Sequence, residues 1–192
     1  MKKNMLTYII IGFVLIIGIL ISCNTKPNNE IKEQKTEKSS EQNPYDNMRN
    51  MAFSIKSEQL GLNEFDKNDV YGIISEMDIN GATATVVTFI TGDTSLYLST
   101  GGGFIGAGQH ESVREIVKKY VKNGQKYLDK GMFIEKSNLP SKGMTKFNFL
   151  TNSGIYCIEK KTSELESGKS EFSNLFMEMN EIITQIRLKS EK

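Results

Sequence analysis

The chain has 192 residues, of which 38% are hydrophobic and 24% are charged, so it can form one domain with a buried core between its two ends. Lys and Arg together number 24 against 23 for Asp and Glu. This near-neutral balance argues against a nucleic-acid-binding protein. The chain has one histidine, His110, and two cysteines, Cys23 and Cys157. A Cys/His zinc site needs three or four such ligands, so no metal site is predicted, and no cofactor is predicted either.

The N-terminal segment has two lysines near its start and an apolar run over residues 6–21. The run is long for a secretory signal peptide and slightly short for a membrane span. It ends in Leu20-Ile21-Ser22-Cys23, which resembles the lipobox of bacterial lipoproteins. The resemblance implies that residues 1–22 are a signal peptide, removed before Cys23, and that the thiol of Cys23 carries fatty-acyl chains such as palmitate.

The alternative is an uncleaved anchor helix in which Cys23 is incidental. Both interpretations predict a protein of the bacterial cell envelope that is tethered to a membrane and faces outside the cytoplasm. Acyl chains contribute about 0.8 kcal/mol per buried methylene, so two or more of them would anchor the chain durably.

Residues 23–47 are predicted to be a lipidated cysteine followed by a disordered tether. Apart from Ile31 and Tyr45, residues 24–46 are polar, charged or proline. Such a segment cannot bury enough apolar surface to offset the entropy of ordering it. The sequence therefore predicts a tether that connects the anchor to a single folded domain over residues 48–192.

The first half of this domain is predicted to be a short helix followed by a three-stranded meander. Met48, Met51, Ala52 and Ile55 are at helical spacing. Asn80-Gly81 is a strong hairpin signal, because a type I′ turn needs positive φ at both central residues. The predicted elements are a helix near 48–55, a helical turn at 57–61 and strands at 70–79, 82–90 and 94–99.

The second half is predicted to add two amphipathic helices and two more strands. The helix over 111–130 carries a sustained apolar stripe, and the last helix over 171–188 carries another. The strands fall at 145–150 and 155–159, and residues 160–170 are predicted to be a loop. The predicted fold is α+β, with about five antiparallel strands in βββ-α-ββ-α order and both helices on one face.

A glycine-rich run at 99–110 connects the meander to the first long helix. Gly101, Gly103 and Gly106 satisfy G-x-G-x-x-G, but the preceding strand closes an antiparallel meander, which argues against a dinucleotide site. One interpretation is that the glycines let the end of the strand run close beneath a helix, or supply bulges and positive φ at a sharp exit from the strand. The other is a small anion bound by backbone N–H groups. The candidate ligand-binding residues are Gly101, Gly102, Gly103, Gly106, Gly108 and His110.

The run from Ser95 to Gly108 reads SLYLSTGGGFIGAG. Together with Val70-Tyr71-Gly72 and the strand that begins at Ala82, it resembles a family of small bacterial proteins of unassigned function. The resemblance covers roughly residues 52–188. It implies one intact domain and no particular chemistry.

Catalytic side chains do not form a recognisable set. His110 could be combined with Ser95 or Ser99 and with Asp93 into a hydrolase triad, but no G-x-S-x-G motif is present. Cys157 lies in a predicted strand and is interpreted as a small, half-buried hydrophobic residue. No catalytic residue is therefore predicted.

The sequence predicts a membrane-anchored lipoprotein with a non-catalytic binding domain, whose partner is an unknown protein or small molecule. The alternative is a domain that binds a small anion or ligand, possibly with hydrolytic activity, through residues 101–110.

Overall fold

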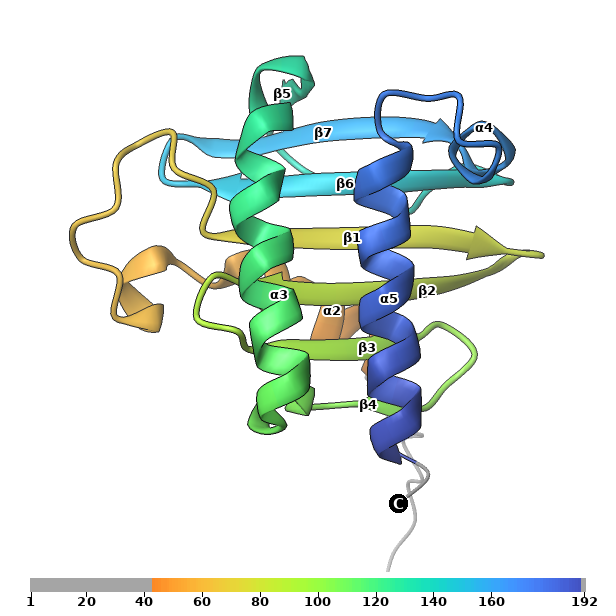
Figure 1. The fold of residues 1–192 in the computed structure, drawn as a ribbon, viewed down its shortest axis with the longest axis horizontal. Coiled ribbons are helices and arrows are strands. Elements are labelled where there is room, and N and C mark those ends of the chain that lie inside the picture. Colours follow the sequence, from red (N-terminus) through yellow and green to blue (C-terminus); the bar gives the residue numbers. More distant parts are fainter. Residues whose placement is uncertain (1–42, 191–192) are drawn as a thin grey trace, which may run out of the picture. The chain divides into compact units, whose positions relative to one another are not determined.

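A computed structural model describes residues 43–190, which form an α+β domain (Figure 1). A seven-stranded antiparallel sheet has the order β4-β3-β2-β1-β6-β7-β5. The predicted signal peptide, Cys23 and most of the predicted tether lie outside the described residues. No helix within residues 43–190 is long and apolar enough to cross a membrane.

The strands are β1 Gly72–Ile79, β2 Ala82–Phe89, β3 Thr94–Leu98, β4 Gly103–Phe104, β5 Met132–Ile134, β6 Met144–Thr151 and β7 Gly154–Lys161. The helices are α2 Pro44–Ser54, α3 Glu111–Gly124, α4 Thr162–Glu166 and α5 Ser173–Ser190. Short 3-10 helices occupy Ser57–Leu60, Ala107–Gln109 and Gln125–Lys130.

The predicted hairpin between the first two strands is confirmed. Asn80 has φ 53° and Gly81 has φ 90°, so both central residues of the turn have the positive φ that a type I′ turn needs. β2 pairs with β1 on one side and with β3 on the other, as the meander prediction requires.

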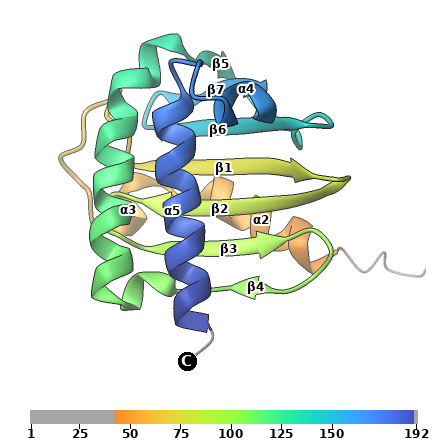
Figure 2. The same cartoon turned by 45° about the vertical axis from the view of Figure 1, so that its right-hand side comes forward.

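One face of the sheet is covered by α3 and α5, which lie side by side (Figures 1 and 2). Both predicted apolar stripes point into this layer. The fully buried side chains here include Ile73, Val113, Val117, Tyr120, Phe147, Phe149, Leu175, Met179 and Ile182. The prediction of two amphipathic helices on one face is therefore confirmed.

The opposite face is covered by α2, which lies behind the sheet in Figure 1. α2 begins at Pro44, and Asn43 caps it by accepting a hydrogen bond from the Tyr45 N–H. The first turn of α2 thus falls within the segment predicted to be the tether. α2 and the chain that follows it pack on a second apolar cluster, whose buried members include Tyr71, Ile74, Val87, Phe89 and Leu150.

The predicted strand count of about five, and with it the predicted element order, was wrong. β4 has two residues and β5 three, which is too short for the alternation of side chains to show in a sequence. Both are edge strands that pair with only one neighbour. The predicted loop 160–170 contains the short helix α4.

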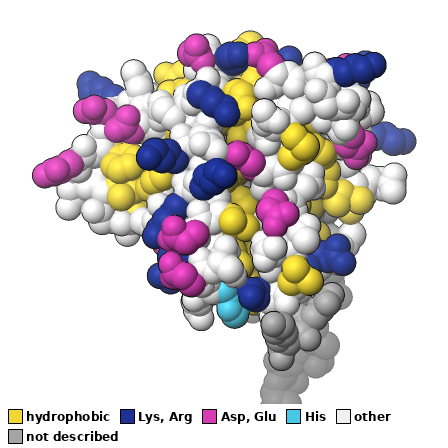
Figure 3. Space-filling model, in the orientation of Figure 1, with side chains coloured by type: hydrophobic (Ala, Val, Ile, Leu, Met, Phe, Trp, Pro, Cys, Tyr) yellow, Lys and Arg dark blue, Asp and Glu magenta, His cyan; other side chains and the backbone are white. Residues whose placement is uncertain are grey.

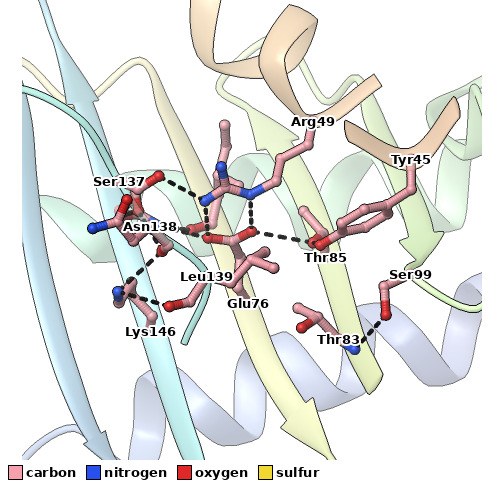
Figure 4. A network of polar contacts seen from close by, with 12 residues as sticks. Tyr45, Arg49, Glu76, Thr83, Thr85, Ser99, Ser137, Asn138, Leu139 and Lys146 are labelled. Atoms are coloured by element: carbon pink, nitrogen blue, oxygen red, sulfur yellow. Dashed lines mark hydrogen bonds and ion pairs between the residues drawn. The ribbon is translucent and has the colours of Figure 1, made fainter. Parts of the chain in front are cut away.

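A buried ion pair fixes α2 to the centre of the sheet (Figure 4). Arg49 Nε donates to Glu76 Oε1 at 2.6 Å, and Arg49 Nη2 donates to Glu76 Oε2 at 2.8 Å. The Glu76 side chain is 0% exposed and that of Arg49 is 9% exposed. Burial opposes the charge on Arg49, but the hydrogen bond and the charge of Glu76 outweigh it and raise the pKa of the guanidinium.

Neighbouring polar groups complete this network. Thr85 Oγ1 and Asn148 Nδ2 donate to the Glu76 carboxylate at 3.3 and 3.4 Å, while Arg49 Nη2 also donates to the Ser137 carbonyl at 3.0 Å. The Tyr45 hydroxyl lies 2.7 Å from Thr85 Oγ1. One helix and three strands therefore meet at a single carboxylate, and the 135–139 segment joins them through the Arg49 guanidinium.

Replacing Arg49 with Met should destabilise the domain by about 3–5 kcal/mol, because Glu76 would stay buried without its partner. Urea unfolding followed by circular dichroism measures the loss. The double variant Arg49→Met/Glu76→Gln should recover part of it. As a control, Lys118→Met removes the exposed Lys118–Glu115 pair and should leave the unfolding midpoint nearly unchanged. Equal midpoint shifts for Arg49→Met and Lys118→Met would contradict the central role of the buried pair.

Candidate functional site

The glycine-rich run forms the β3–β4 hairpin at one edge of the sheet. Gly101, Gly102 and Gly103 have φ of 99°, 81° and 151°, so three successive residues have positive φ, which side chains disfavour. Gly103 pairs with Tyr97 across the hairpin. The sharp reversal of the chain therefore explains why glycine occupies three of the six positions predicted to bind a ligand.

Two of the glycines lie against other backbone. A Cβ on Gly103 would lie 2.2 Å from the Leu96 carbonyl oxygen, and one on Gly108 would lie 2.3 Å from the Gly92 carbonyl oxygen. The close approach is therefore to β3 and to the β2–β3 turn. At these two glycines the close neighbour is strand or turn backbone rather than a helix, although the Gly108 carbonyl accepts a hydrogen bond from Arg114 Nε of α3 at 2.9 Å. The positive φ of residues 101–103 agrees with the other part of the interpretation, a sharp exit from the strand. The glycine that allows a helix to lie close to the sheet is Gly124 in α3, because a Cβ there would lie 2.3 Å from Ile73 Cδ1 of β1.

Several N–H groups of the run donate to acceptors within the protein. Gly101 donates to the Leu98 carbonyl, and Gly106 donates to Ser95 Oγ at 3.3 Å. The N–H groups of Gln109 and His110 donate to the carbonyls of Gly106 and Ala107. These four donors are therefore already used within the protein, which leaves fewer N–H groups of the run to bind an anion.

His110 is the N-cap residue of α3, and its ring centroid lies 6.5 Å from that of Phe104. Ser99 Oγ accepts a hydrogen bond from the Thr83 N–H at 2.8 Å (Figure 4). Asp93 precedes β3 and Ser99 follows it, so an extended strand separates them by about 20 Å. The other candidate serine, Ser95, accepts a hydrogen bond from the Gly106 N–H at 3.3 Å. Among the described residues, no hydrogen bond joins His110 to Asp93, Ser95 or Ser99, so the contacts of a hydrolase triad are not formed.

A cavity of about 310 Å³ lies between α2 and the edge of the sheet, and the glycine-rich run borders it. Ile105 and Gly106 are the two residues of the run that line it. The remaining lining is mostly apolar and comes from α2, β2 and β3, including Met48, Met51, Ala52, Val87 and Tyr97. Ile105 is 70% exposed and Met51 is 68% exposed at this cavity. The sequence did not indicate it, because α2 and β3 are brought together only by folding.

Cys157 lies in β7 and is partly buried. Its burial raises the pKa of the thiol to about 11, although Lys146 lowers it somewhat. A thiol with a raised pKa is a weak nucleophile at neutral pH, because the thiolate is the reactive form. Within residues 43–190, no group of three or more His, Cys, Asp and Glu side chains is placed to hold a metal ion.

The buried Arg49–Glu76 network between α2 and β1 was not predicted from the sequence. The sequence did contain a signal, because Glu76 stands among mostly apolar residues in the strand predicted at 70–79. In the structure, residues 72–76 of this strand are all buried. A charged residue in such a strand needs a buried partner. The partner could not be identified from the sequence, because Arg49 is 27 residues away.

Gly103→Ala should destabilise the domain more than Gly102→Ala, by about 1–3 kcal/mol, because only at Gly103 does the added methyl group meet backbone. Both variants impose a positive φ on alanine, so Gly102→Ala isolates the cost of the backbone strain. Urea unfolding of the two variants gives the comparison. Equal losses would show that the close approach to Leu96 does not constrain this hairpin.

The Cys157 thiol should react with iodoacetamide at pH 8 about a hundred times more slowly than a free cysteine, because its pKa lies near 11. The rate should rise with pH towards pH 11, and it should return to the free-cysteine value in urea. Mass spectrometry of the peptide that contains Cys157 follows the reaction. Fast alkylation at pH 8 in the folded protein would contradict this environment.

A scan of protein-family models, a search of curated proteins and a search of solved structures find no match to this chain. These comparisons therefore assign the chain to no family, and its function is inferred from its residues and their geometry.

Proposed function

We propose that the protein is a lipid-anchored lipoprotein of the bacterial cell envelope whose folded domain is a non-catalytic binding module outside the cytoplasm. The observation that carries the proposal is the apolar run over 6–21 that ends in Leu20-Ile21-Ser22-Cys23. An aliphatic residue, a small residue and a cysteine in this order at the end of an apolar run are the features that resemble a lipobox.

The position of the folded domain is consistent with such an anchor. The first helix among the described residues, α2, begins at Pro44, so residues 24–43 separate Cys23 from it. A flexible chain of this length has a root-mean-square reach of about 25 Å. The tether joins the domain at α2, which the Arg49–Glu76 pair fixes to the sheet. The domain would thus be attached to the membrane through a helix that a buried ion pair holds on the sheet.

A binding role is favoured over a catalytic one by the geometry of the nucleophilic groups. Asp93 and Ser99 stand at opposite ends of β3, and the raised pKa of Cys157 keeps its thiol protonated at neutral pH. The alternative of an anion or ligand site at residues 101–110 has less support, because the N–H groups of Gly101, Gly106, Gln109 and His110 donate within the protein.

Growth with radiolabelled palmitate tests the anchor. The wild-type chain should incorporate the label and fractionate with membranes. Cys23→Ala should lose the label, because no other residue can provide the thioether-linked cysteine at the cleavage site. Cys157→Ala is the matched control, because it removes the other thiol but leaves the lipobox intact, and it should keep the label. Labelling that survives Cys23→Ala would contradict the lipobox assignment. A wild-type chain that fractionates with membranes but incorporates no label would favour the uncleaved anchor helix.

A further inference from the structure

β7 has a backbone edge that β5 covers only in part (Figure 1). On the β6 side, the Thr162 N–H donates to the Gly143 carbonyl at 3.0 Å, directly after the last pair of the β6–β7 register. Residues of an antiparallel strand direct their backbone groups alternately to the two sides. By this alternation, the N–H groups of Glu159 and Lys161 point away from β6.

β5 pairs with residues 155–157 of β7, so within the described chain no strand lies opposite Glu159 and Lys161. A cavity of about 500 Å³ runs along this part of the edge. We call it the β7 notch. Met132 provides apolar surface in it and is 74% exposed, whereas Ile158 and Phe172 line it as buried residues. The notch thus combines an unpaired strand edge with apolar surface.

The charge around the β7 notch is positive. Four lysines and two glutamates line it: Lys130, Lys136, Lys146, Lys160, Glu159 and Glu171. Lys130 pairs with Glu171, and Lys146 Nζ lies 3.6 Å from Glu159 Oε2. Lys136 and Lys160 remain as the excess charge.

The two excess lysines lie on opposite faces of the sheet edge. Lys160 Nζ lies 5.2 Å from the centroid of the Phe172 ring, at the start of α5. Lys136 also lines a cavity beside Arg49 and Phe53, on the side covered by α2. An added strand would direct alternate side chains to these two faces. Acidic residues on both of its faces would therefore each meet a lysine.

We propose that the β7 notch binds an acidic, extended segment of a partner protein as an added strand. The inference deepens the proposed binding function, on which it rests, by naming the chemistry of the partner. Backbone hydrogen bonds to Glu159 and Lys161 would hold the segment, and Lys136 and Lys160 would select acidic side chains. A second copy of the same edge would bring lysine against lysine, which disfavours self-pairing.

The test uses the purified full-length lipoprotein in detergent micelles and a fluorescein-labelled peptide of Glu, Val and Thr. A second peptide with every Glu replaced by Gln controls for charge. The charge-reversal variant is Lys136→Glu/Lys160→Glu. Its matched control is Lys119→Glu/Lys122→Glu, which makes the same change in net charge on exposed residues of α3. Circular dichroism verifies that each variant is folded.

The acidic peptide should bind the wild type and the α3 control, and its affinity for Lys136→Glu/Lys160→Glu should fall at least about tenfold. Hydrogen exchange at the amides of Glu159 and Lys161 should slow when the peptide binds. Equal binding of the Glu and Gln peptides, equal loss in both variants, or unchanged exchange at these amides would overturn the proposal. If the acidic peptide does not bind but palmitate labelling depends on Cys23, only the proposal for the β7 notch is rejected. If palmitate labelling fails but the peptide binds, the lipid anchor is rejected and the proposal for the notch is kept.

Discussion

The buried pair of Arg49 and Glu76 is the interaction on which the two-sided architecture depends. A carboxylate with no exposed surface in the middle of β1 requires a cation and further donors. α2 provides the cation, β2 and β6 provide hydroxyl and amide donors, and the Ser137 carbonyl occupies another guanidinium donor. The position of α2 and the course of the chain after β5 are therefore both set by one charged side chain.

The two faces of the sheet are stabilised in different ways. α3 and α5 bury a continuous apolar layer, which contributes free energy in proportion to its area and without a preferred direction. The α2 face combines a smaller apolar cluster with directional hydrogen bonds. Cavities remain on both sides of α2 because a single helix cannot cover this face. The surfaces available for binding thus lie beside α2 and along the sheet edges, where the apolar layer is incomplete.

The α3–α5 face provides no comparable surface. Figure 3 shows basic and acidic side chains interspersed over it, and Glu111 and Glu115 pair with Arg114 and Lys118 along α3. Mixed charges of this kind keep a helix face soluble without selecting a partner. At the β7 notch, by contrast, lysines without an acidic partner among the described residues lie next to backbone groups that can form hydrogen bonds. The backbone groups can position a partner strand, and the positive charge can select acidic side chains on it.

The sequence by itself determined the elements whose signals are local: the Asn80-Gly81 hairpin, the long strands, and the apolar stripes of α3 and α5. These follow from backbone preference and side-chain periodicity within a few residues. Tertiary structure alone decided the rest. β4 and β5 exist only because a neighbouring strand pairs with them, and Arg49 meets Glu76 across 27 residues of sequence. The glycine-rich run looked like a possible ligand loop because its pattern is local, whereas the backbone that it approaches is brought there only by folding.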